Sequence, residues 1–316
     1  MSITFAIIVY KGGEIKMKTI LVTGGTTFVS RYVAEYYLKK DYKVYVLNRN
    51  TKPQSNGVIL IEADRKNIGE KLRDYHFDIV FDITAYNEDD INSLLNALGS
   101  FNDYIMISSS AVYPEYHPQP FTEETQIGKN KIWGKYGTDK IAAEKTLLKR
   151  VPSAYILRPP YLYGPMNNVY REAFVFECAL QDRKFFIPKN GELKLQFFHV
   201  EDLCRFMDIL IKTMPTQHIF NVGNKCAVTV KEWVNICYNV AGKYAETIPV
   251  FDDVEQRNFF SFYDYEYFLD VNKQYELMPE TKPLIEGLQE SFEWYICNKE
   301  KVIKKPFIEF IDNNLI

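Results

Sequence analysis

Histidine and closely spaced cysteine are scarce in this sequence. It has only four histidines (His76, His117, His199 and His218) and five cysteines (Cys178, Cys204, Cys226, Cys237 and Cys297). The histidines are scattered and no two cysteines have the Cys-x-x-Cys spacing, so no metal-binding pattern is present. An odd number of dispersed cysteines favours reduced thiols over a disulfide framework. We therefore expect a cytoplasmic protein with no metal site.

An excess of one charge and long apolar runs are also missing. Lysine and arginine number 38 against 41 aspartates and glutamates, which gives a formal net charge of -3. Dedicated nucleic-acid binders usually carry a strong basic excess, so this balance disfavours nucleic acid as a partner. The apolar stretch at residues 1–10 is too short to span a bilayer, and no basic region precedes it. We expect neither a signal peptide nor a membrane segment.

Residues 1–16 are predicted to be a leader or a non-native extension. Residues 12–17 read Gly-Gly-Glu-Ile-Lys-Met, and a purine-rich stretch resembling a bacterial ribosome-binding site can encode Gly-Gly-Glu. On this hypothesis translation starts at Met17. Mass spectrometry of the native N-terminus tests it, and an intact peptide from residues 1–16 would contradict it.

From Lys18 onward, short apolar segments alternate with amphipathic ones. The pattern predicts strands at 18–23, 43–48, 57–64, 77–85, 103–109 and 154–159, and helices at 27–40, 91–100 and 136–150. This alternation favours an α/β fold of the Rossmann type, a doubly wound parallel sheet covered by helices on both faces. We assign residues 17–160 to this dinucleotide-binding domain. Residues 161–316 are assigned mainly to a smaller substrate lobe, with segments near 195–225 returning to the sheet.

The first predicted strand leads into the stretch TGGTTFVS, which is short of glycine. A fingerprint spaced Gly-x-x-Gly-x-x-Gly would need glycine at 24, 27 and 30, but the sequence has Gly24, Thr27 and Ser30. Free N–H groups at the start of a helix bind phosphate. We therefore predict that Gly24, Gly25, Thr26, Thr27 and Phe28 hold a dinucleotide, the alternative being a simple tight turn. An unrelieved extra Cβ at Ser30 costs about 1–3 kcal/mol, so a somewhat displaced pose is expected.

The next strand lacks the acidic residue that selects NAD by binding the ribose hydroxyls. Asn48 and Arg49 stand at its end. Because arginine binds phosphate through charge-assisted hydrogen bonds, this pair favours NADP over NAD. The alternative is that Arg49 is a solvated surface residue.

Tyr136 and Lys140 follow a serine-rich strand end, Ser108 to Ser110. Residues four apart share one face of a helix. A lysine ammonium beside a phenol favours the phenolate and lowers the pKa of the tyrosine, which suits it to proton transfer. A serine hydroxyl from the strand end is then placed to bind the reacting oxygen.

The stretches TGGTTF, SSSAVY, YGTDKIAAEK, LRPPYLYGP, FFHVEDL and FNVGN together resemble an extended short-chain dehydrogenase/reductase of the NAD-dependent epimerase/dehydratase family. The likeness runs from Lys18 almost to the C-terminus. VLNRN, ADR, FDIVFDITAY and the late run from FFSFYDYEYFLDVNK are similar to an atypical branch that includes bacterial epimerase-like proteins and chloroplast stem-loop-binding proteins.

The resemblance implies specific roles for these residues. Tyr136 would be the general acid/base, Lys140 its pKa-lowering partner and a ribose contact, and Ser109 the carbonyl-orienting hydroxyl, with Ser108 and Ser110 as competitors. The further cofactor contacts it implies are Asp64 and Arg65 beside the adenine, and Ala85 and Tyr86 near the ribose. Pro159 is expected to be a further cofactor contact. The implied substrate contacts are Ser110, Tyr161 and Gln196.

Two departures narrow the implied activity. Dehydratases of the family carry an acidic pair after the serine or threonine, where this chain has Ser110 and Ala111, so dehydration is disfavoured. Sugar-nucleotide epimerases commonly place a diphosphate-binding arginine where this chain has Gln196, which cannot make that bidentate contact. Lys194 or Arg257 could compensate.

We therefore expect an NAD(P)-dependent epimerase or oxidoreductase that acts on a hydroxyl or carbonyl of a sugar or sugar-nucleotide-like substrate. The alternatives are an RNA-binding or RNA-processing protein that reuses the fold, and a non-catalytic dinucleotide-binding scaffold. Relatives pair through two long helices, so the resemblance also implies a homodimer.

Overall fold

The computed structural model describes residues 17–251 and 254–316. The proposed leader, residues 1–16, therefore lies outside the described residues. None of the helices in the described part of the chain is long and apolar enough to cross a bilayer.

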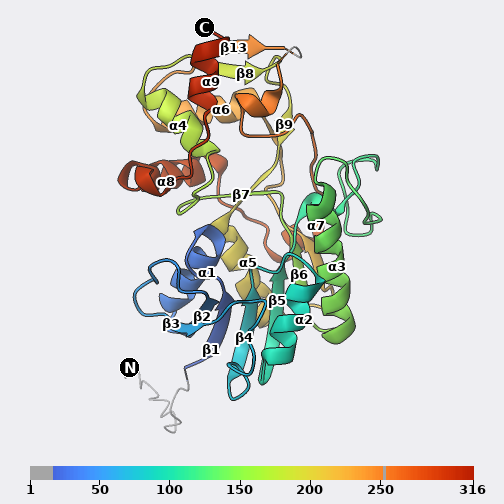
Figure 1. Ribbon diagram of the computed structural model, residues 1–316. Coiled ribbons are helices and arrows are strands. Elements are labelled where there is room, and N and C mark those ends of the chain that lie inside the picture. Colours follow the sequence, from blue (N-terminus) through green and yellow to red (C-terminus); the bar gives the residue numbers. More distant parts are fainter. Residues whose placement is uncertain (1–16, 252–253) are drawn as a thin grey trace, which may run out of the picture.

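A seven-stranded sheet in the order β11-β6-β5-β4-β1-β2-β3 forms the base of the molecule (Figure 1). All of its strand pairs are parallel. The strands are β1 (Thr19–Thr23), β2 (Lys43–Asn48), β3 (Ile59–Glu62), β4 (His76–Asp82), β5 (Ser100–Ile107), β6 (Tyr155–Arg158) and β11 (Ile219–Asn221). The chain reverses direction across the sheet between β1 and β4, and ligands bind at such switch points beyond the carboxyl ends of the strands.

Helices cover both faces of this sheet. On one face α1 and α5 pack against β1, β2 and β4, whereas α2 and α3 bury their apolar sides on the other. Their bounds are α1 (Phe28–Leu38), α2 (Glu88–Ala97), α3 (Gly134–Arg150) and α5 (Val200–Thr213). The predicted doubly wound α/β fold is thus confirmed. The strands and helices of this part of the chain lie close to their predicted positions.

A second lobe stands above the carboxyl ends of these strands (Figure 1). Its helices are α4 (Glu172–Leu180), α6 (Val230–Val240), α8 (Leu284–Cys297) and α9 (Phe307–Asn314), and α7 (Asn272–Leu277) lies by β11. Three two-stranded sheets complete the described elements: β7 (Tyr161–Tyr163) with β10 (Phe197–His199), β8 (Phe185–Pro188) with β13 (Thr247–Val250), and β9 (Lys194–Leu195) with β12 (Val228–Thr229). The 3₁₀ turns are η1 (Ser110–Val112), η2 (Gln256–Asn258) and η3 (Lys299–Lys301).

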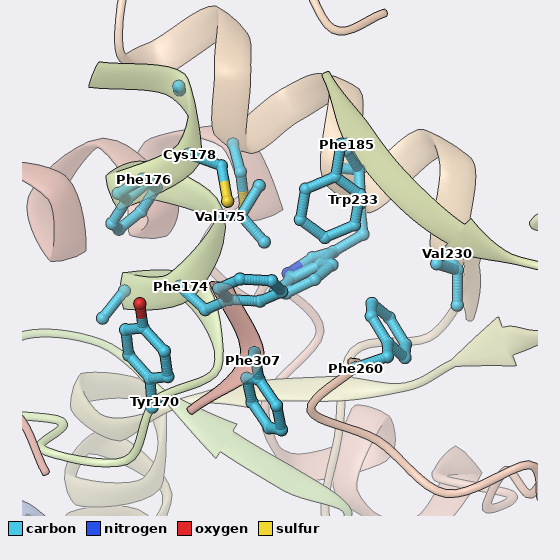
Figure 2. Packing of buried hydrophobic residues seen from close by; sticks show 14 of the residues in the cluster. Tyr170, Phe174, Val175, Phe176, Cys178, Phe185, Val230, Trp233, Phe260 and Phe307 are labelled. Atoms are coloured by element: carbon cyan, nitrogen blue, oxygen red, sulfur yellow. The ribbon is translucent and has the colours of Figure 1, made fainter. Parts of the chain in front are cut away.

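Aromatic side chains dominate the core of the second lobe. Figure 2 shows Trp233 of α6 among Phe174 and Phe185, with Phe307 of α9 below them. Trp233 is 1% exposed. Large aromatic rings remove much apolar surface from water and prefer such offset or edge-on contacts. The lobe therefore has its own hydrophobic core and can present a rigid wall to the sheet below.

Candidate functional site

The loop after β1 has the geometry of a phosphate-binding turn. Gly24 and Gly25 adopt φ angles of 92° and 91°, which favour glycine. A Cβ on Gly25 would lie 2.6 Å from Cγ1 of Val46, so the loop runs directly against β2. Thr27 precedes α1 and its side chain makes no capping hydrogen bond. The N–H groups of the first helical turn are therefore available to an anion.

Ser30 is accommodated by the glycine that faces it. The Ser30 hydroxyl donates to the Thr27 carbonyl at 3.0 Å. A Cβ on Gly24 would lie only 2.8 Å from Ser30 Oγ. The missing side chain at position 24 thus leaves the space that the extra atoms at position 30 occupy, and the hydroxyl has a partner.

Beside this loop lies a pocket of about 410 Å³, the edge pocket. Predicted cofactor residues that line it are Gly24, Thr26, Thr27, Asn48, Arg49, Asp64, Arg65 and Tyr86. Asn48 donates to the Gly24 carbonyl at 2.7 Å, so its amide holds the loop in place. Arg49 is exposed and forms no hydrogen bond or ion pair with any described residue. Lys52, which the sequence reasoning missed, also lines this pocket and donates to Thr27 Oγ1 at 3.2 Å.

The guanidinium of Arg65 is paired with a buried carboxylate below the edge pocket. Its two terminal nitrogens each lie 2.6 Å from an oxygen of Asp82, which is 0% exposed. Burial by itself would raise the pKa of Asp82, but the charge and hydrogen bonds of Arg65 outweigh it and hold that pKa below its usual value. Arg65 therefore forms part of the pocket wall, while its guanidinium charge is neutralised by Asp82.

A second pocket of about 410 Å³, the central pocket, opens at the carboxyl ends of β5 and β6. Ser109, Tyr136 and Lys140 line it together, as do Phe28, Tyr86, Pro159 and Tyr161. Ser108 also lines this pocket, but its hydroxyl already donates to the buried carboxylate of Glu144. Ser110 is 3% exposed and is absent from the lining, so the predicted substrate contact of Ser110 does not fit its position. Ser109 is the serine that faces Tyr136.

The electrostatics of Tyr136 and Lys140 differ from the prediction. The Lys140 ammonium donates to the carbonyls of Ala85 at 2.6 Å and Ile107 at 2.9 Å. Burial lowers the pKa of Lys140 to about 8, although Asp82 and Glu144 oppose this. Desolvation raises the pKa of Tyr136, and its interaction with Ser109 opposes the rise. The expected lowering of the Tyr136 pKa by Lys140 is not found: burial raises that pKa, and the Lys140 ammonium is bound to two backbone carbonyls.

Gln196 does not reach the pocket. It is 1% exposed, its amide nitrogen donates to the carbonyls of Asn224 and Leu269, and its amide oxygen accepts from the Leu269 N–H at 2.8 Å. Both polar ends are thus bound to the backbone, and the predicted substrate contact of Gln196 is wrong on this geometry. The residue joins the segment before β10 to the chain near Leu269.

Three aromatic or charged residues of the central pocket were missed by the sequence reasoning. They are Trp133, Arg171 and Tyr267. Arg171 stacks on the ring of Tyr161, with its guanidinium carbon 5.4 Å from the ring centroid. The guanidinium of Arg171 forms one described hydrogen bond, a long one of 3.4 Å to the Leu162 carbonyl. Arg171 directly precedes α4, and periodicity alone does not distinguish an arginine at that place from a surface residue.

The fold also brings together three potential metal ligands that are distant in sequence. One ligand atom each of His199, Glu201 and Glu290 lies within 4.8 Å of the others. The Lys282 ammonium contacts both carboxylates, so a positive charge is already supplied. Burial, followed by the Lys282 charge, lowers the pKa of His199 to about 3 and keeps it neutral. This cluster is an internal ion pair beside a packed histidine.

Comparison with known proteins agrees with this architecture. The pattern of the NAD dependent epimerase/dehydratase family matches residues 20–223. The chain is 26% identical over 302 residues to the chloroplast stem-loop binding protein of 41 kDa b from Arabidopsis thaliana, covering 87% of this chain and 78% of that protein. It is 25% identical over 316 residues to a putative UDP-glucose 4-epimerase of Methanocaldococcus jannaschii, covering 87% and 97%.

A solved structure of dTDP-glucose 4,6-dehydratase from Bacillus anthracis in complex with NAD has the same fold. Its TM-score is 0.71 at 20% identity, with 90% of this chain and 98% of that chain covered. The fold, the glycine turn and the matched segment together define the class, and the chain belongs to the NAD-dependent epimerase/dehydratase family.

Proposed function

We propose that this protein is an NAD(P)-dependent epimerase that inverts a hydroxyl-bearing carbon of a sugar or sugar-nucleotide-like substrate. The observation that carries the proposal is that Ser109, Tyr136 and Lys140 line one pocket beside the glycine turn. Phe28 and Tyr86 continue that pocket toward the loop and the edge pocket. A dinucleotide that spans the two pockets would meet the tyrosine with its reactive end.

The residues of the edge pocket fit a phosphate-bearing dinucleotide. The uncapped first turn of α1 offers N–H donors, and the close approach of Gly25 to Val46 leaves the backbone uncovered. We infer that the unpaired guanidinium of Arg49, with Lys52 nearby on the same wall, binds a 2′-phosphate. This assignment favours NADP.

The roles of the chain's own groups follow from the pocket. When bound, the nicotinamide supplies a hydride acceptor that can return the hydride. Tyr136 takes the proton of the substrate hydroxyl as its carbon loses hydride, and gives the proton back when hydride returns to the opposite face. Ser109 donates a hydrogen bond to the same oxygen. Lys140, fixed by the Ala85 and Ile107 carbonyls, supplies positive charge beneath the site.

Arg171 supports an anionic substrate. It is a cation in the wall of the central pocket, and none of the ion pairs among the described residues includes it, although its charge acts on the buried carboxyl of the adjacent Glu172. Arg171 can therefore bind the diphosphate of the substrate, the contact that Gln196 cannot make. Arg257 is directed elsewhere, because its guanidinium donates to the carbonyls of Phe260 and Ser261.

Epimerisation in D₂O tests this mechanism. UDP-, dTDP- and GDP-sugars are incubated with the protein and NADP or NAD, and the inverted carbon is examined by NMR and mass spectrometry. Because hydride is stored and returned, the product should contain no solvent deuterium at that carbon. Stoichiometric deuterium there would show that a proton is abstracted from carbon, and would contradict the proposal.

The relative from Arabidopsis, by its name a stem-loop binder, supports RNA binding as a second candidate. The net charge of -3 weighs against it. Titration with a labelled RNA stem-loop at 50 and 200 mM salt distinguishes the two. Binding that falls steeply with salt, without dinucleotide binding, would favour the RNA function.

A further inference from the structure

A further pocket, outside the cleft at the glycine turn, lies on the second lobe beside its last helix. It has a volume of about 410 Å³ and shares no lining residue with the edge or central pockets. Figure 1 shows α9, which forms one of its walls, at the end of the second lobe away from the seven-stranded sheet. We call it the distal pocket. Its lining includes Arg257 and Asn258 of η2, Lys305 just before α9, and Glu309, Phe310 and Asn313 of α9.

Two cations of the distal pocket have no carboxylate partner. None of the ion pairs among the described residues includes Lys305 or Arg257. Lys305 forms no hydrogen bond with a described residue, whereas Nη1 of Arg257 donates to the carbonyls of Phe260 and Ser261. Burial lowers the pKa of Lys305, and the like charges of Arg257 and Arg171 lower it further. Positive charge is thus gathered here without a paired counter-charge, and such a site attracts anions.

Aromatic rings hold both cations without neutralising them. The guanidinium carbon of Arg257 lies 4.5 Å from the ring centroid of Tyr263, and the Lys305 ammonium lies 5.9 Å from that of Phe307. Such cation–π contacts attract a cation but leave its N–H donors free. Arg257 uses only Nη1 in its described hydrogen bonds, so Nε and Nη2 remain for the paired contact that guanidinium groups make with phosphate.

The rest of the lining fits hydroxyl groups and a sugar ring. The side-chain amides of Asn258 and Asn313 have no hydrogen-bond partner among the described residues, and each can donate and accept. Glu309 is exposed and forms no ion pair with a described residue, so its carboxylate is an acceptor for hydroxyl donors and repels a ligand that is anionic throughout. The ring of Phe310 is partly exposed and offers an apolar face to the C–H groups of a sugar.

We propose that the distal pocket binds a monosaccharide phosphate, with the phosphate on Lys305 and Arg257 and the sugar hydroxyls on Glu309 and the asparagine amides. One doubly charged group accounts for both cations, and the single carboxylate of the lining accounts for the hydroxyls. The volume lies within the range of small-molecule sites, about 300–1,000 Å³. This site adds a ligand to the second lobe and does not rest on the proposed epimerase activity.

The test is calorimetric titration of the full chain with glucose 6-phosphate, and with glucose and inorganic phosphate as its two parts. Lys305→Gln and Glu309→Ala change the distal pocket. Lys304→Gln is the matched control, because the neighbouring lysine pairs with Glu177 and is outside the lining. Arg171→Gln reports on binding in the central pocket instead. Neither turnover nor a dinucleotide enters the measurement, so the result is independent of the proposed function.

We expect glucose 6-phosphate to bind at least tenfold more weakly to Lys305→Gln, and within threefold of wild type to Lys304→Gln and Arg171→Gln. Glu309→Ala should weaken glucose 6-phosphate at least threefold without weakening inorganic phosphate. Glucose and phosphate should each bind at least tenfold more weakly than glucose 6-phosphate.

The proposal is overturned if glucose 6-phosphate does not bind, or if Lys305→Gln and Lys304→Gln bind it alike. It is also overturned if Arg171→Gln abolishes binding while Lys305→Gln retains it, because the ligand then occupies the central pocket. Inorganic phosphate that binds as tightly as glucose 6-phosphate would contradict the contacts to the sugar. Circular dichroism confirms that each variant is folded.

Discussion

Arg158 and Glu144 form a buried ion pair directly behind the central pocket, with Nη2 of Arg158 2.6 Å from Oε2 of Glu144. Their side chains are 3% and 2% exposed. The Tyr113 hydroxyl accepts from Arg158 at 2.8 Å and itself donates to Asn221. Ser108 also donates to Glu144, so its hydroxyl belongs to this network, and Ser109 is the serine that faces Tyr136.

Removing one partner of this pair should destabilise the fold strongly. Arg158→Met leaves a buried carboxylate without a counter-charge, which costs about 3–5 kcal/mol in the free energy of unfolding. Lys135→Met breaks an exposed pair with Asp139 and should cost less than about 1 kcal/mol. Urea denaturation measures both, and equal costs would show that the buried network contributes little.

Gly25 should tolerate alanine less well than another glycine of similar conformation. Gly69 has a φ of 64° but open space where a Cβ would stand, whereas a Cβ on Gly25 meets Val46 at 2.6 Å. Gly25→Ala should therefore cost about 1–3 kcal/mol more than Gly69→Ala. Paired denaturation curves measure the difference. A larger loss in Gly69→Ala would mean that β2 yields easily to the added methyl group.

The burial of Lys140 should be visible in the pH dependence of stability. Its pKa is about 8 in the folded protein against 10.5 ordinarily. Between these values the unfolded chain binds the extra proton, so stability rises with pH as the folded lysine loses its charge. From pH 7.5 to 9.5 the wild type should gain about 2 kcal/mol relative to Lys140→Met. If the difference in unfolding free energy between wild type and Lys140→Met does not change across this range, the pKa of Lys140 in the folded protein lies near its ordinary value.

Arg49 should discriminate between the two dinucleotides. If its unpaired guanidinium binds the 2′-phosphate, Arg49→Gln loses a charge-assisted hydrogen bond of about 1.5–3 kcal/mol. The Kd of NADPH should then rise at least tenfold while that of NADH stays within threefold. Arg73→Gln, an exposed arginine outside the pockets, serves as the control. Equal changes for NADPH and NADH in Arg49→Gln would assign the residue to a contact common to both.

Local spacing predicted the features that depend on neighbours in the chain. The glycine turn, the serine that follows β5 and the Tyr136–Lys140 pair on α3 were all predicted from strand and helix periodicity. Ser109, Tyr136 and Lys140 line the central pocket, and Gly24 lines the edge pocket beside it. The confirmed α/β fold rests on the same alternation of periods.

The site features that could not be predicted from the sequence depend on contacts between residues that are distant in the chain. The side-chain amide of Gln196 is hydrogen-bonded to the backbone of Leu269, and the Lys140 ammonium donates to the carbonyls of Ala85 and Ile107. A motif identifies a polar group but not the distant backbone atom that binds it. Arg171 and Tyr267 enter the central pocket from the second lobe, whose segments lack a regular period. Their roles required the packed structure.

The central claim is that Tyr136 moves the proton in an epimerisation. The most direct measurement compares the turnover of a sugar-nucleotide substrate by wild type, Tyr136→Phe and the exposed control Tyr116→Phe, with the NADPH Kd determined on the same samples. We predict that Tyr136→Phe lowers kcat by about 100-fold to 10,000-fold and leaves the Kd within threefold, while Tyr116→Phe matches the wild type. Undiminished kcat in Tyr136→Phe would contradict the account.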